Sequence, residues 1–165
     1  MEIKKSDLIL QDFNVLNFSF KTDNSFKGIP EFQNYIVDMD FKILTDKVKI
    51  GEFINILAMN INTQKLKLPG YSFSILTIGK FYINNFKSHP DKEKNNFIFR
   101  SSLPMMIANC RAFLSNVSAF GKFGKYSLPS IDITHFLNNY KPEDSKIKIV
   151  EKSKPVKLKK NKSRK

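Results

Sequence analysis

The 165-residue sequence contains one cysteine, two histidines and no tryptophan. The scarcity of cysteine and histidine argues against disulfide bonds and metal sites. A lone Cys110 cannot form an intramolecular disulfide or a cysteine-based metal cluster, so a reducing compartment fits the chain best. His89 and His135 have no nearby cysteine or paired acid at ligand spacing, which argues against a metal centre. Cys110 falls at a core position of a predicted helix, where a buried, inert thiol is expected rather than a nucleophile.

Long apolar runs are missing as well. No segment approaches the roughly 18 apolar residues of a membrane span, and the N-terminal MEIKKSDLIL has no apolar run of signal-peptide length. We therefore expect a cytoplasmic protein without membrane insertion. Candidate catalytic patterns are weak, because Asp38 and Asp40 share the solvent face of a strand and GKFGK at 121–125 lacks P-loop spacing. The sequence predicts neither an enzyme nor a bound cofactor.

Positive charge is abundant but unevenly placed. The net charge is +13, yet residues 146–165 hold ten Lys or Arg against Glu151 alone, which leaves a net +4 in residues 1–145. We expect one domain over residues 1–145 and a basic, disordered tail over residues 146–165. Only three arginines occur, whereas proteins that read base sequence rely on arginine. Nucleic-acid binding through the lysine-rich tail remains an alternative function, and A/T-rich coding would explain the lysines without any function.

Four segments show the alternation of apolar and polar residues that predicts β-strands. In the first, Leu16 is out of step and predicts a bulge, while the preceding residues 6–11 are interpreted as a short helical turn. In the third and fourth, both faces carry apolar residues, which indicates that both are partly covered. Short connections between the second, third and fourth segments favour antiparallel pairing. The four segments are residues 13–20, 35–43, 52–62 and 71–84.

Two helices are predicted after a polar break at residues 85–96. Apolar residues recur at steps of three and four from Leu103 to Phe120, with serines and Pro104 at the expected start and Gly121 beyond the end. Asp132 is placed to cap a second, short helix with an apolar stripe. The fold class is therefore α+β, a four-stranded antiparallel sheet followed by one long and one short helix. Because one long helix cannot cover the sheet and also hide its own stripe, we expect oligomerisation.

Apolar side chains also occur in two connections, where polar residues are the rule. The connection at residues 22–33 carries Phe26, Ile29 and Phe32, and the connection between the helices carries a further group of aromatic residues. Such side chains either fold back as plugs on their own core or remain exposed to bind other chains. The sequence leaves both readings open.

The run LPMMIANCRAFLSNVSAFGKFGKYSLPSIDITHFLNNY, residues 103–140, resembles the C-terminal half of the SecB-like protein-export chaperone family. In that family a long helix that starts near a proline and carries a small residue, Cys and Arg leads through a glycine and aromatic turn to a short final helix. FSFK at 18–21 stands where the family's first strand ends, and LPGY at 68–71 is similar to SecB-like proteins outside the standard export system. The resemblance covers roughly residues 8–141 and depends on the order of elements rather than on one motif.

The resemblance implies an ATP-independent holdase that binds unfolded polypeptides, such as preproteins or an antitoxin of a toxin–antitoxin system, in hydrophobic grooves. It also implies a homotetramer assembled as a dimer of dimers. Docking of the motor protein SecA is not expected, because that interaction uses an acidic sheet face and this chain is basic. The client-binding residues that the resemblance implies lie in the first long connection, the interhelix connection and the last helix: Phe26, Ile29, Phe32, Phe120, Phe123, Tyr126, Leu128, Ile133, Phe136 and Leu137.

Overall fold

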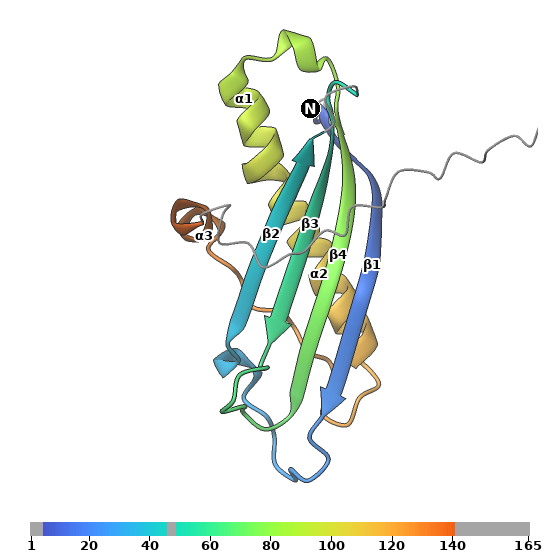
Figure 1. Ribbon diagram of the computed structural model, residues 1–165. Coiled ribbons are helices and arrows are strands. Elements are labelled where there is room, and N and C mark those ends of the chain that lie inside the picture. The colour runs from blue at the N-terminus through green and yellow to red at the C-terminus, as the bar shows by residue number, and fades with distance from the viewer. Residues whose placement is uncertain (1–4, 46–48, 141–165) are drawn as a thin grey trace, which may run out of the picture.

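The computed structural model describes residues 5–45 and 49–140 (Figure 1). Four antiparallel strands form one sheet in the order β1-β4-β3-β2. The four strands are β1 (Leu8–Thr22), β2 (Val37–Thr45), β3 (Glu52–Ile61) and β4 (Tyr71–Ile83). The predicted sheet and its antiparallel connections are therefore confirmed. The predicted basic tail, residues 146–165, lies outside the described residues.

Strand β1 is longer than the sequence pattern predicted. It begins at Leu8, so the interpretation of residues 6–11 as a helical turn is wrong. Its register against β4 shifts between Leu10 and Asp12 and again between Val15 and Asn17. The second shift is the bulge that Leu16 predicted, and two bulges let one long strand keep its apolar side chains on one face of a twisted sheet.

Residues 85–96, which the sequence analysis treated as a polar break before the first helix, in fact contain helical turns. A 3-10 turn (Phe86–Ser88), α1 (Asp91–Asn95) and a π-helical turn (Asn96–Ser101) lead directly into α2 (Ser102–Ser118). The wide turn stands just ahead of Pro104, which has no N–H to complete an ordinary helical hydrogen bond. Ser102 is consequently buried inside a helical run, where its hydroxyl donates to Ile98 O and accepts from Asn55 Nδ2.

The long helix α2 covers one face of the sheet, and the chain then returns to α3 (Ile133–Asn139) beside β2 (Figure 1). The predicted cap is confirmed: Asp132 Oδ1 accepts a hydrogen bond from His135 N at 2.8 Å. One hydrophobic core lies between α2 and the sheet, and Cys110 is part of it. In the described part of the chain no helix is long and apolar enough to cross a membrane.

Candidate functional site

Hydrogen bonds from α2 fix the connection between the two helices. Arg111 donates from Nε to Leu128 O at 3.0 Å and from a terminal nitrogen to Pro129 O at 3.1 Å. The Ser115 hydroxyl donates to Tyr126 O at 3.0 Å, and Tyr126 N donates to the Ser118 hydroxyl at 2.8 Å. These bonds satisfy the backbone of residues 126–129 without regular secondary structure, so the segment can enter the core.

The buried position of this segment corrects part of the sequence-based site. Tyr126 is 0% exposed and Leu128 is 2% exposed, so the expectation that both remain accessible is wrong. Their burial follows from the α2 side chains that hold their main chain. Both belong to the hydrophobic core, where they lie beneath the more exposed residues of the predicted site.

Phe32, from the crossover connection between β1 and β2, lies against three tyrosines. Its ring stacks on Tyr71 with centroids 5.4 Å apart and meets the edges of Tyr35 and Tyr126 at 5.5 Å each. The Tyr35 hydroxyl donates to Pro69 O and accepts from Tyr71 N, which fixes two of these rings. The arrangement combines rigid aromatic rings with a side chain from an irregular segment.

A second contact joins the crossover connection to the loop after α2. The rings of Phe26 and Phe123 lie 6.0 Å apart, and Phe123 lies 5.4 Å from Tyr71. Lys122 Nζ donates to Asn24 O at 2.8 Å and to Phe26 O at 2.7 Å. We call Phe26, Phe32, Tyr35, Tyr71, Phe123 and Tyr126 the aromatic cluster.

The loop reaches the aromatic cluster because Gly121 has no side chain. A Cβ at Gly121 would lie 2.4 Å from the Tyr71 hydroxyl, which accepts a hydrogen bond from Phe123 N at 2.7 Å. Gly124 has φ +74°, a conformation that glycine adopts without strain. The glycines of GKFGK therefore serve close approach and a turn rather than phosphate binding.

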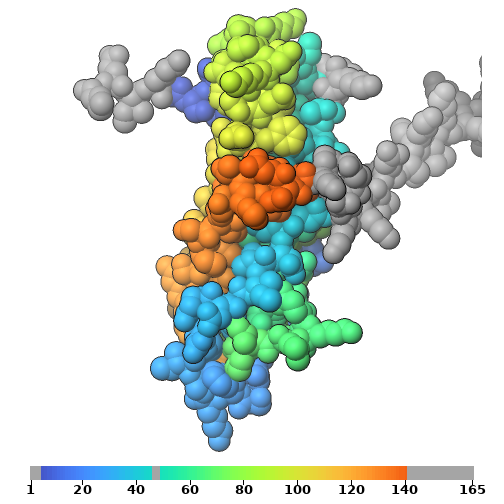
Figure 2. Space-filling model, turned by 90° about the vertical axis from the view of Figure 1, so that its left-hand side faces the viewer, coloured from blue at the N-terminus to red at the C-terminus, as the bar shows by residue number. Residues whose placement is uncertain are grey.

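The predicted residues of α3 form a separate group. Phe136 and Tyr140 lie on Phe41 of β2 with centroids 5.8 and 4.4 Å away, and the Tyr140 hydroxyl donates to Phe41 O. Ile133 and Leu137 are partly buried against the core. Figure 2 shows α3 between the helical residues that precede α2 and the crossover connection.

Ile29 and Phe120 join neither group, since they are 92% and 99% exposed. Sequence reasoning missed the parts of the aromatic cluster that belong to regular strands and their ends, above all Tyr71. It also missed Arg111 and Lys122 as the side chains that position the irregular segments. Tyr71 is the last residue of the LPGY motif, and that motif was the one available signal for it. The alternating pattern predicted only that Tyr71 belongs to a strand.

Burial raises the pKa values of titratable groups in and beneath these clusters. Burial raises the pKa of the Cys110 thiol to about 11, although a contact with the Thr77 hydroxyl opposes the shift. Burial also raises the pKa of Tyr126 and of Tyr35. Residues 5–45 and 49–140 contain no group of three His, Cys, Asp or Glu side chains that could hold a metal ion.

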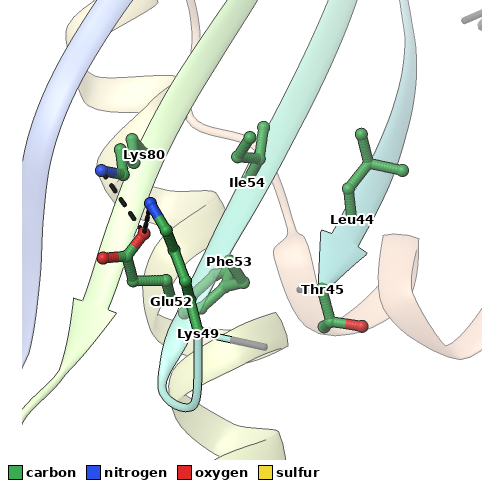
Figure 3. Close-up of a pocket in the computed structure, with 7 residues that line it drawn as sticks. All are labelled: Leu44, Thr45, Lys49, Glu52, Phe53, Ile54 and Lys80. Carbon is green, nitrogen blue, oxygen red and sulfur yellow. Dashed lines mark ion pairs between the residues drawn. The ribbon is translucent and has the colours of Figure 1, made fainter. Parts of the chain in front are cut away.

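The opposite face of the sheet has a different surface. Leu44, Ile54, Ile56, Leu76 and Ile78 lie on the side away from α2, which we call the outer face. At one end a hollow of about 560 Å³ is lined by Leu44 and Ile54 and by a group in which Lys49 and Lys80 both face the Glu52 carboxylate (Figure 3). The sequence-based expectation of a partly apolar second face is confirmed.

Comparison with known proteins gives a match at the level of structure alone. No family model matches the sequence, and no curated protein matches it. A protein of unknown function from Streptococcus agalactiae aligns at 6% identity and a TM-score of 0.48, over 78% of this chain and 100% of that one.

A second solved structure is the Mycobacterium tuberculosis SecB-like chaperone Rv1957 in complex with a ChAD peptide from the HigA1 antitoxin Rv1956. It aligns at 9% identity and a TM-score of 0.54, over 76% of this chain and 88% of that one. The two share a four-stranded antiparallel sheet with one long and one short helix. The chain described here has the SecB-like fold.

Proposed function

We propose that this protein is an ATP-independent holdase that binds unfolded segments of other polypeptides at the aromatic cluster and along α3. The observation that carries the proposal is the meeting of two irregular segments, the crossover connection and the interhelix loop, over a floor of fixed tyrosine rings. Aromatic rings contribute large apolar area at low conformational cost, so they suit clients without a fixed sequence.

The clients are extended segments rich in apolar residues. Each large apolar side chain that a client buries contributes about 1.5–3 kcal/mol, and several such sites along one chain add avidity. The SecB-like neighbour was solved with an antitoxin peptide, which supports the inclusion of antitoxin segments among candidate clients. Release then follows mass action or transfer to a partner, without a nucleotide.

We also propose a homotetramer, a dimer of dimers. Small side chains at Ala108 and Ala112 are exposed on α2 together with Asn116, so this face of the helix allows close approach of another helix. The measurement is native mass spectrometry of the full chain, and a monomer at micromolar concentration would contradict this part of the proposal.

The function is tested by the aggregation of a chemically unfolded client, measured by light scattering with and without the protein. We expect suppression by the wild-type protein and weaker suppression by Phe123→Asp, because a carboxylate would be placed between Phe26 and Tyr71. Lys125→Asp, at an exposed position two residues away, is the matched control. Equal suppression by wild type and Phe123→Asp would contradict binding at the aromatic cluster.

The rival function, nucleic-acid binding through residues 146–165, predicts a different salt response. Binding through lysines to phosphates falls steeply as salt increases, whereas burial of apolar side chains does not. A chain truncated after residue 145 should retain client binding at high salt. Loss of all binding on truncation would favour the nucleic-acid function instead.

A further inference from the structure

The crossover connection fills the aromatic cluster with rings of its own. Phe32 occupies the space between Tyr35, Tyr71 and Tyr126, and Phe26 lies on Phe123. Between these two anchors Ile29 is 92% exposed. The segment is therefore held at two rings six positions apart, with an exposed stretch between them.

The main chain of this segment is held in a way that does not depend on its sequence. Lys122 donates to the carbonyl oxygens of Asn24 and Phe26, atoms that every polypeptide possesses. At the other end Asn34 N and Tyr35 N close a local 3-10 turn on Glu31 O and Phe32 O. Detaching residues 24–32 would break four ring contacts, the Lys122 bonds and the local turn on Glu31 and Phe32, but no strand ladder.

One buried hydroxyl beneath Phe32 lacks a hydrogen-bond partner in the described part of the chain. The Tyr126 hydroxyl is buried and makes no hydrogen bond within the described residues. A buried donor without a partner is unfavourable, so the covered state of the cluster is less stable than its ring contacts alone suggest. The main chain of Tyr126 is held by Ser115 and Ser118, so this residue stays in place when the crossover connection leaves.

We propose that residues 24–32 are a built-in placeholder for a client: they occupy the aromatic cluster in the free protein, and a client segment with two large apolar rings six positions apart replaces them. Lys122 then donates to carbonyl oxygens of the client, and the Tyr126 hydroxyl gains an acceptor. The proposal rests on the proposed function and adds a preferred spacing to it. Binding is weakened by the fraction of molecules in which the placeholder is seated, so unseating it strengthens client binding.

The first test uses a fluorescein-labelled peptide with the sequence of residues 22–34, TDNSFKGIPEFQN, and the full-length protein. Binding is measured by fluorescence anisotropy to wild type, to Phe26→Ala/Phe32→Ala, and to the control Ile29→Ala. We expect the double variant to bind the peptide about tenfold more tightly than wild type, and the control to match wild type. Equal or weaker binding by the double variant would overturn the proposal.

A second variant keeps the test decisive where the double variant does not fold. A Cβ at Gly28 would lie 2.7 Å from the Phe26 ring, while the backbone of Gly28 is not in the left-handed region. Gly28→Ala therefore disturbs the placeholder without touching the floor of the cluster. We expect about threefold tighter peptide binding by Gly28→Ala and no change with Lys27→Ala. Weaker binding by Gly28→Ala would mean that the crossover connection is part of the client site rather than its placeholder.

The spacing is tested with a peptide in which the two phenylalanines are moved to three positions apart. We expect this peptide to gain less than about twofold from either variant. Equal gains for both spacings would overturn the spacing rule. Failure of the proposed function gives a different result, namely that neither wild type nor any variant suppresses aggregation of the unfolded client.

Discussion

The aromatic cluster and the outer face both present apolar side chains at the surface, but different parts of the chain hold them. At the outer face Ile54 and Ile78 are half-buried residues of β3 and β4, so the strand ladder fixes their positions. At the aromatic cluster Phe26 and Phe32 belong to a connection that ring contacts and Lys122 hold in place. The outer face can change shape only if the sheet opens, whereas the aromatic cluster can change while the sheet remains intact. Adaptation to varied clients is therefore expected at the aromatic cluster alone.

The largest change in the free energy of unfolding is expected in β4, whose two faces differ in burial. Ile75 is buried against α2, and its neighbour Leu76 is half-buried on the outer face. We expect Ile75→Ala to lower the free energy of unfolding by about 3 kcal/mol and Leu76→Ala by about 1 kcal/mol, because only the first opens a cavity in the core. Urea denaturation of both variants measures the difference. Equal losses would mean that the outer face is as well covered as the core.

Replacing the Arg111 guanidinium should show how much residues 126–129, which lie beneath the crossover connection, contribute to stability and to client binding. Arg111→Met loses two hydrogen bonds to the carbonyls of Leu128 and Pro129, and we expect a loss of about 2 kcal/mol in the free energy of unfolding. The control is Arg100→Met, since Arg100 is exposed. We also expect Arg111→Met to weaken client binding, because the floor that carries Tyr126 loses its attachment to α2. Unchanged client binding would show that residues 126–129 play no part in it.

The sequence predicted the features of the sheet and its outer face that depend on the periodicity of apolar residues. Alternation identified the four strands and the apolar outer face, and the Asp132 cap marked α3. It did not predict the helical turns at residues 86–88 and 91–101, because their side chains are mostly polar or exposed and a π-helical turn interrupts the helical period.

The site was predicted as a set of apolar residues in connections. Composition does not predict which of these residues are buried or which residues they contact. Burial of Tyr126 depends on the hydrogen bonds that its main chain forms with the hydroxyls of Ser115 and Ser118, and polar side chains of this kind are not visible in a hydrophobic pattern. The contact between Lys122 and the crossover connection joins residues almost one hundred positions apart. Such contacts follow from the tertiary fold rather than from local spacing.

Removing the Tyr126 hydroxyl should have the opposite sign to most core substitutions. Buried tyrosine hydroxyls usually form hydrogen bonds, and their loss then costs about 1 kcal/mol. In Tyr126→Phe the lost hydroxyl has no partner among the described residues, so we expect the free energy of unfolding to increase by about 0.5–1 kcal/mol. Thermal denaturation of the free protein is the measurement. A clear loss of stability would reveal that the hydroxyl is satisfied in solution.

The smallest effect is expected at the outer-face hollow, where Glu52 lies 3.8 Å from Lys49 Nζ and 3.4 Å from Lys80 Nζ. Both lysines are well exposed, so solvent and salt screen these ion pairs, and we expect Glu52→Gln to lower the free energy of unfolding by no more than about 0.5 kcal/mol. The difference should disappear at high salt, and client binding should not change, because the hollow lies on the face away from α2. Urea denaturation at low and high salt, with anisotropy measured on the same samples, checks both expectations. A loss of client binding in Glu52→Gln would place the client on the outer face and would remove the distinction between a fixed face and an adaptable cluster.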